Sequence, residues 1–161
     1  MPATAPSNGL SSARVALPIR AQGGMLAHSF MRRIIVTSVI VENVPATHVV
    51  RIDALVDTRA GYLTLPMAWK ERFGAFALEE EVTLQTATQQ VVGGTVCGPA
   101  LVRIEGFRPV HGEVLFVDME PEEGEYEPLL GYIPLEQCGA AVDLIGHRLL
   151  PVRHIDAKAA C

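Results

Sequence analysis

The feature that most constrains this chain is a single carboxylate placed where two apolar segments meet. Residues 48–56 alternate between apolar and polar positions, which predicts a half-exposed antiparallel strand. This strand leads directly into Asp57 and a tight turn, and a second apolar segment leaves the turn and stops at Pro66. Because a desolvated carboxylate costs free energy unless it is paired or hydrogen-bonded, an aspartate at this corner indicates a specific role.

The rest of the sequence also consists of short β-type segments. Two short helices are expected, each with a proline at its start and a glycine after its end. Gly93-Gly94 is expected to form a bulge and Gly98-Pro99 to interrupt the chain. Many short strands with only two short helices predict an all-β fold, either a barrel or a folded sandwich. The expected strands span residues 34–41, 81–84, 90–97, 100–105, 113–118, 140–144 and 147–151, and the helices 66–74 and 134–138.

Length and composition are those of one globular domain. The 161 residues are 49% apolar and 19% charged, and the formal net charge is −5. The charge gives no basic surface for nucleic acid, and no apolar run is long enough to span a bilayer. The cysteines are scattered without C-x-x-C spacing, so we expect reduced thiols in a soluble, cytoplasmic protein, with neither disulfides nor a zinc site.

The two ends of the sequence differ from its middle. Residues 1–30 are rich in Ala, Ser, Pro and Gly and contain no acidic residue. We interpret them as a disordered N-terminal extension or the product of a start codon assigned too early, and a transit peptide is the alternative. Residues 31–152 are expected to form the domain, and residues 153–161 a frayed C-terminal tail.

Three features in order resemble the retropepsin-like (clan AA) aspartic proteases, in particular their small bacterial-type single-domain members. Asp57-Thr58-Arg59-Ala60 resembles the family's active-site turn, Asp-Thr/Ser-Gly-Ala/Ser, with Arg59 at the glycine position. Leu129-Leu130-Gly131 resembles the family's strand that crosses behind this turn. The polar hairpin between residues 81 and 97 falls where the family has its flap, which covers the substrate. Its tip consists of Thr86, Ala87, Thr88, Gln89 and Gln90.

The resemblance implies a retropepsin-like barrel with one lobe per chain, and a specific chemistry. Aspartic proteases use two carboxylates that share one proton, one activating water and the other acting as an acid toward the scissile carbonyl. Asp-Thr occurs once in this chain, so the resemblance implies a homodimer in which each chain supplies Asp57. Thr58 would then lock the two turns together, and Ala60 would supply backbone contacts. The implied substrate is a peptide or protein, and neither a metal nor a cofactor is required.

Other interpretations of these residues stay open. Asp57 could be a turn residue whose oxygens accept backbone N–H bonds. Arg59 adds bulk and a fixed positive charge, which favours ionised Asp57. It could therefore make the chain a pseudo-protease that binds peptides or only dimerises, or it could point away and leave an active pair with a lower pH optimum. An unrelated small β-barrel without an active site is a third possibility.

Other candidate chemistries have weaker signals. The histidines show no metal-ligand spacing. A Cys-His nucleophile using Cys97 or Cys138 is an alternative, although Cys138 falls in an apolar helix, where thiols are usually inert. The acidic loop at residues 119–127 lacks the ordered ligands of an EF-hand and is expected to be a solvated loop rather than a calcium site.

Overall fold

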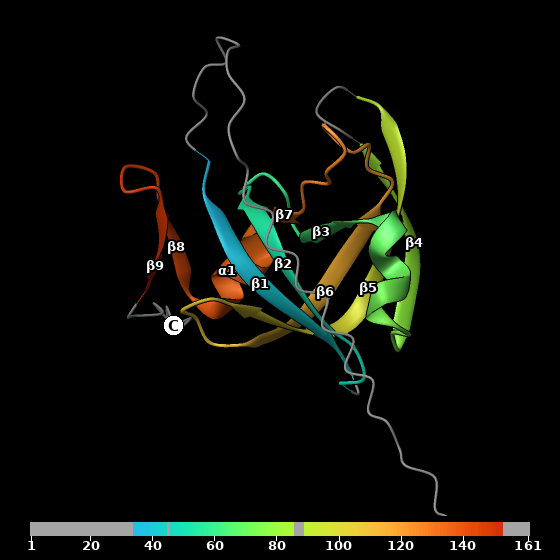
Figure 1. Cartoon of the computed structure of the whole chain (residues 1–161), viewed down its shortest axis with the longest axis horizontal. Coiled ribbons are helices and arrows are strands. Elements are labelled where there is room, and N and C mark those ends of the chain that lie inside the picture. The colour runs from blue at the N-terminus through green and yellow to red at the C-terminus, as the bar shows by residue number, and fades with distance from the viewer. Residues whose placement is uncertain (1–33, 45, 86–88, 153–161) are drawn as a thin grey trace, which may run out of the picture.

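The computed structural model describes residues 34–44, 46–85 and 89–152. The predictions for residues 1–30 and 153–161, and those for Thr86, Ala87 and Thr88, lie outside these residues. Figure 1 shows a mostly β structure with two short helices. The elements in chain order are β1 (Val36–Asn43), β2 (Val49–Val56), β3 (Leu63–Pro66), the 3₁₀ helix η1 (Met67–Phe73), β4 (Leu78–Gln85), β5 (Val91–Ile104), β6 (Val110–Val117), β7 (Leu129–Leu130), α1 (Tyr132–Cys138), β8 (Ala140–Asp143) and β9 (Arg148–Pro151).

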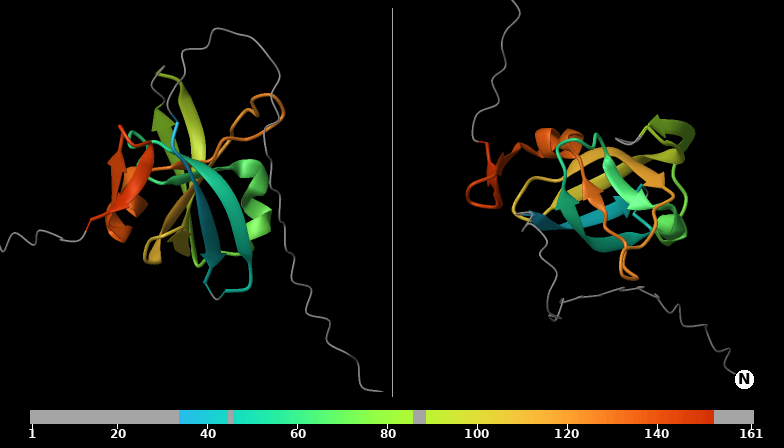
Figure 2. Two further views of the ribbon diagram at one scale, coloured as in Figure 1. Left: turned by 60° about the vertical axis from the view of Figure 1, so that its left-hand side comes forward. Right: turned by 90° about the horizontal axis from the view of Figure 1, so that it is seen from above.

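The main sheet closes on itself. Its strand order is β1-β2-β7-β3-β6-β5-β4, and β1 also pairs with the second half of β5. This additional pairing closes a barrel and leaves β4 as an extension on the outer side of β5. The strands wrap around a common interior in both views of Figure 2. β8 and β9 form a separate two-stranded sheet that follows α1. The predicted all-β barrel is therefore confirmed.

Apolar side chains from the inward faces of the strands fill the interior of the barrel and form the core. On β2, Ile52 and Ala54 are buried while Arg51 and Asp53 are exposed, as the alternation of residues 48–56 predicts. Phe73 is fully buried and packs edge-on against Phe116, with 5.4 Å between ring centroids. The other core side chains are Val39, Val41, Leu63, Leu65, Phe76, Cys97, Ala100, Val102, Ile104, Val110, Val114, Leu130, Leu135 and Cys138.

Both predicted helices are present, with small differences in type and limits. The first is a 3₁₀ helix, and Pro66 is the last residue of β3 rather than the first of the helix. The second begins at Tyr132, two residues before the predicted start at Pro134. Each ends at a glycine with positive φ, 67° at Gly74 and 74° at Gly139, as glycine after a helix predicts.

The predictions for Gly93-Gly94 and Gly98-Pro99, which both lie in β5, were wrong. Gly98-Pro99 does not interrupt the chain, because β5 runs through it as one strand of 14 residues. The β5–β6 register shifts between Cys97 and Ala100, since proline has no N–H to donate to the ladder. Gly93 and Gly94 are paired in regular register with β4 and form no bulge. A Cβ on Gly94 would lie 3.0 Å from the Phe116 carbonyl oxygen, so close strand packing explains the glycine there.

No helix within the described ranges has the length and apolar character needed to cross a membrane.

Candidate active site

Asp57 lies at the surface end of β2, in a turn fixed by backbone hydrogen bonds. Its N–H donates to the Leu130 carbonyl at 3.0 Å, and its own carbonyl accepts the Ala60 N–H at 3.0 Å. The Asp57 side chain is 18% exposed, and the side chains of Thr58 and Arg59 are exposed beside it. The turn therefore presents a carboxylate at the surface instead of sealing it inside the barrel.

Leu129, Leu130 and Gly131 pass between the two strands that flank this turn. β7 pairs in parallel with β2, where Leu55 is opposite Leu129, and antiparallel with β3, where Leu63 is opposite Leu130. Gly131 continues the crossing, because its N–H donates to the Tyr62 carbonyl at 3.0 Å. The same short segment thus holds both ends of the Asp57 turn.

Two further hydrogen bonds connect the turn to α1, and no pattern in the sequence predicts either of them. The N–H of Tyr132 donates to the Ala60 carbonyl at 2.9 Å, and that of Ile133 to the Gly61 carbonyl at 3.0 Å. These donors belong to the first turn of α1, where N–H groups have no partner inside the helix. The turn therefore accepts hydrogen bonds from otherwise unpaired N–H groups of α1, and the same bonds hold the turn in place.

Gly131→Ala is expected to disrupt this crossing. A Cβ on Gly131 would lie 2.6 Å from the Ala60 carbonyl oxygen and would also clash with that of Tyr62. Both obstacles are backbone atoms that cannot rotate away, so we expect the free energy of unfolding to fall by about 2–3 kcal/mol, measured by urea denaturation. Gly93→Ala is the control, because nothing lies within 4 Å of its Cβ position. Equal stability of the two variants would contradict this account of the crossing.

Arg59 pairs with Asp57 through both oxygens of the carboxylate. Its backbone N–H donates to Oδ1 at 3.0 Å, its Nε to Oδ1 at 3.1 Å and its Nη2 to Oδ2 at 3.2 Å. These bonds show that the hypothesis that Arg59 points away is wrong. The planar guanidinium is well suited to this pair, because it can donate two N–H bonds to the two oxygens of one carboxylate. The backbone bond is also the one expected of an ordinary turn aspartate.

The pair sets the charge of Asp57. The Arg59 hydrogen bonds lower the pKa of the Asp57 carboxyl below its usual value, against the opposing effect of partial burial. The Arg59 side chain is 84% exposed, so water screens the interaction. In the single chain Asp57 is consequently an ionised base, and it binds a proton only at a lower pH than a free aspartate.

The hairpin formed by β4 and β5 rises toward the same end of the molecule as the Asp57 turn (Figure 1). Gln89 and Gln90, the described residues of its tip, are exposed, and Gln89 has a positive φ of 63°. Among the described residues, the Asp57 side chain is hydrogen-bonded to Arg59.

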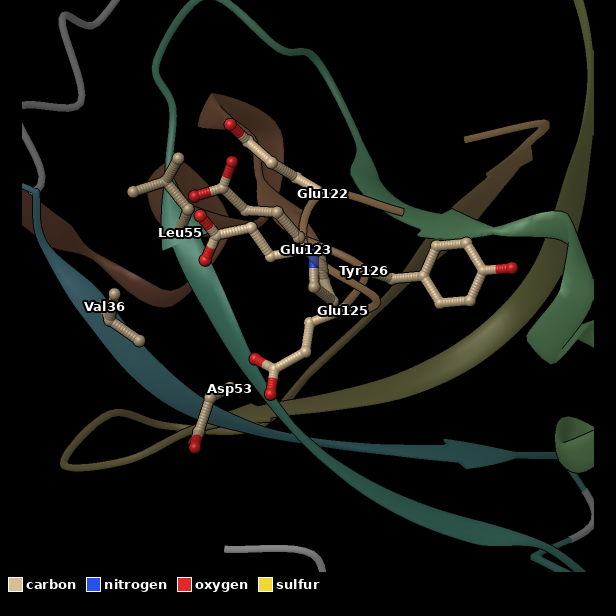
Figure 3. A pocket seen from close by; sticks show the side chains of 9 residues that line it. Val36, Asp53, Leu55, Glu122, Glu123, Glu125 and Tyr126 are labelled. Carbon is tan, nitrogen blue, oxygen red and sulfur yellow. The ribbon is translucent and has the colours of Figure 1, made fainter. Parts of the chain in front are cut away.

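An acidic depression of about 380 Å³ lies on the outer side of β1 and β2, between Val36, Leu55 and the loop at residues 119–127. Figure 3 shows that the carboxylates of Glu122, Glu123 and Glu125 lie on one side of this loop, while Tyr126 points to the other. Tyr126 packs against Trp69, with 5.8 Å between ring centroids. Within the described part of the chain, no group of His, Cys, Asp or Glu is arranged to hold a metal ion.

The cysteines that the sequence offered as nucleophiles are buried. Cys97 is fully buried in the core, and desolvation raises its pKa to about 11. Burial also raises the pKa of Cys138, whose thiol donates to the Leu135 carbonyl. Because the thiolate is the reactive form, neither side chain has the environment of a nucleophile.

Thiol labelling tests this assignment. In a Cys161→Ser variant, we expect Cys97 of the folded protein to react with an aromatic disulfide reagent at pH 8 at least about a hundredfold more slowly than in urea, and buried Cys138 also to react more slowly. The reason is that a pKa near 11 leaves about one thiol in a thousand ionised at that pH. Labelling of Cys97 at the same rate in the folded and unfolded protein would contradict the assignment.

With this geometry established, comparison with solved structures shows a clear likeness. The chain is similar to a retroviral protease, the EIAV protease in complex with the inhibitor HBY-793, with a TM-score of 0.52 and 18% sequence identity. The likeness covers 73% of this chain and 99% of the viral one. The chain has a retropepsin-like fold. No protein-family model matches the sequence, and no curated protein matches it either. At this identity the likeness concerns the fold alone.

Proposed function

We propose that this chain is an aspartic-type endopeptidase that acts as a homodimer, with Asp57 from each chain forming the catalytic pair. The observation that carries the proposal is the position of Asp57 within a retropepsin-like fold. It is a partly exposed carboxylate in a turn held from behind by Leu129, Leu130 and Gly131. A rigid support of this kind is what a catalytic group requires for precise placement.

The proposed chemistry needs only the two carboxylates and a water molecule. One ionised Asp57 takes a proton from water, which attacks the scissile carbonyl, while the other, protonated, donates its proton to the carbonyl oxygen. Two like charges about 3 Å apart disfavour double ionisation, so the pair titrates as a unit. Thr58, exposed beside Asp57, is proposed to join the two turns, and Ala60 to keep the turn in shape through its backbone bonds to Asp57 and Tyr132.

The proposal extends to the parts of the chain around the site. The tip at residues 86–90 would cover a bound peptide, and residues 31–152 would be the protease domain between two extensions. The substrate would be a peptide or protein, and no metal or cofactor would be needed. The free, buried thiols of Cys97 and Cys138 agree with a cytoplasmic location.

A specific observation favours a second candidate, a pseudo-protease that binds peptides or only dimerises. The bidentate Arg59 pair satisfies Asp57 with a partner that cannot lose its charge. If this pair persists in the dimer, it keeps both carboxylates ionised at neutral pH, so they cannot share a proton there. Peptide cleavage by the native chain, Asp57→Asn and Arg59→Gly across a range of pH distinguishes the two. Cleavage by native protein supports the protease, and cleavage only by Arg59→Gly supports the pseudo-protease.

A further inference from the structure

The guanidinium of Arg59 has a second edge that its own chain does not use. The Nε and Nη2 side of the group holds Asp57, and no other partner of Arg59 occurs in the described part of the chain. The side chain is 84% exposed, so its Nη1 side is accessible. Because a guanidinium can donate along two edges, Arg59 can hold a second carboxylate without releasing the first.

Asp57 and Arg59 together make a surface element that complements a copy of itself. One chain presents a negative and a positive group side by side at the same corner. A two-fold rotation that brings two such corners together can place each guanidinium opposite the other chain's carboxylate. The two carboxylates alone would repel, whereas two carboxylates with two guanidinium groups carry no formal net charge.

We infer that Arg59 bridges the two chains of the dimer, with one edge on its own Asp57 and the other on the partner's Asp57. The inference rests on the proposed function, from which it takes the dimer. It makes Arg59 a positioning residue of the dimer interface, at the position where the retropepsin-like aspartic proteases have glycine. Dimerisation of this chain should therefore depend on salt, because the bridging ion pairs lie at an exposed corner.

The charge of the rest of the chain favours the partner's Asp57 over an acidic ligand at the free edge of Arg59. The chain has a net charge of −5, and the loop beside β2 contributes four carboxylates to the lining of the depression, those of Glu122, Glu123, Glu125 and Glu127. Two such chains repel at long range, and so would an acidic peptide. The partner's Asp57 has the advantage that two-fold symmetry in the proposed dimer fixes it beside Arg59 in both chains at once.

Sedimentation equilibrium of the full chain tests the bridge without reference to catalysis. We expect Arg59→Gln to raise the dimer dissociation constant at low salt by at least about tenfold, and Arg59→Lys to have an intermediate effect, since lysine cannot offer two flat edges. Arg103→Gln is the matched control, because it removes one exposed positive charge and its ion pair with Glu42. It should change the constant by less than about threefold. Added salt should raise the dissociation constant of the native dimer far more than that of the Arg59→Gln dimer.

Several results would overturn the inference. They are a native chain that is monomeric at every concentration, an Arg59→Gln dimer as tight as the native one or tighter, and an equal effect of Arg103→Gln. Unchanged dimerisation together with weaker binding of a glutamate-containing peptide, relative to its glutamine counterpart, would assign the free edge to a ligand instead. A native dimer that depends on Arg59 but cleaves no peptide would support the bridge and contradict the protease proposal.

Discussion

Asp57→Asn is expected to abolish peptide cleavage while leaving the fold and its stability almost unchanged. In a homodimer the substitution replaces both carboxylates, so neither chain can take a proton from water or donate one to the carbonyl. Removal of a general acid and base predicts a loss of at least about 10³-fold in kcat/KM. The Asp57 backbone bonds to Leu130 and Ala60 do not involve the side chain and should persist.

The measurement compares cleavage of a fluorogenic peptide mixture by the two proteins at equal dimer concentration. Asp53→Asn is the control, because Asp53 lies on the same strand with an exposed side chain and is not part of the Asp57 turn. It should retain activity within about twofold, as expected for a surface substitution. Cleavage by Asp57→Asn at the native rate would rule out the aspartic mechanism.

Arg59→Gly is expected to move the pH dependence of cleavage upward. The Arg59 hydrogen bonds favour the ionised form of Asp57 and lower its pKa. A proton therefore enters the native pair only at lower pH, and the singly protonated, active form exists in an acid-shifted range. Without the guanidinium the carboxylate binds a proton more readily, so the active range should move to higher pH, although water at this exposed site limits the effect.

The expected result at neutral pH is higher activity in Arg59→Gly than in native protein, and lower relative activity in acid. The pH–rate profiles are measured at protein concentrations where both are dimeric, as sedimentation establishes. Arg59→Lys keeps the charge without the flat fork and should give a profile between the two. A profile that stays in place, or moves to lower pH, would show that Arg59 does not control the proton of Asp57.

The sequence predicted those parts of the fold that depend on local patterns. Alternation in residues 48–56 predicted the buried and exposed faces of β2 because one face of that strand lines the core. Gly74 and Gly139 predicted the helix ends because positive φ favours glycine. The crossing of Leu129 and Leu130 between β2 and β3 was expected only from the family resemblance, because a strand that pairs with partners more than sixty residues away leaves no local signal.

The errors occurred where tertiary pairing determines the local structure. Gly98-Pro99 is typical of a chain break, yet neighbouring strands hold β5 extended through it and the ladder only changes register. Likewise, the sequence shows that Arg59 is charged and adjacent to Asp57, but not the direction of its side chain. Both orientations fit a surface turn, and only the backbone path of this turn brings Nε and Nη2 to the two carboxylate oxygens.

The measurement that tests the central claim most directly is the separation of the two Asp57 carboxylates in a crystal structure of the native chain, grown at a concentration where it is dimeric in solution. Our account predicts a two-fold axis between the Asp57 turns, with the nearest carboxylate oxygens about 3 Å apart. A dimer in which the two turns lie on opposite sides of the assembly would contradict it.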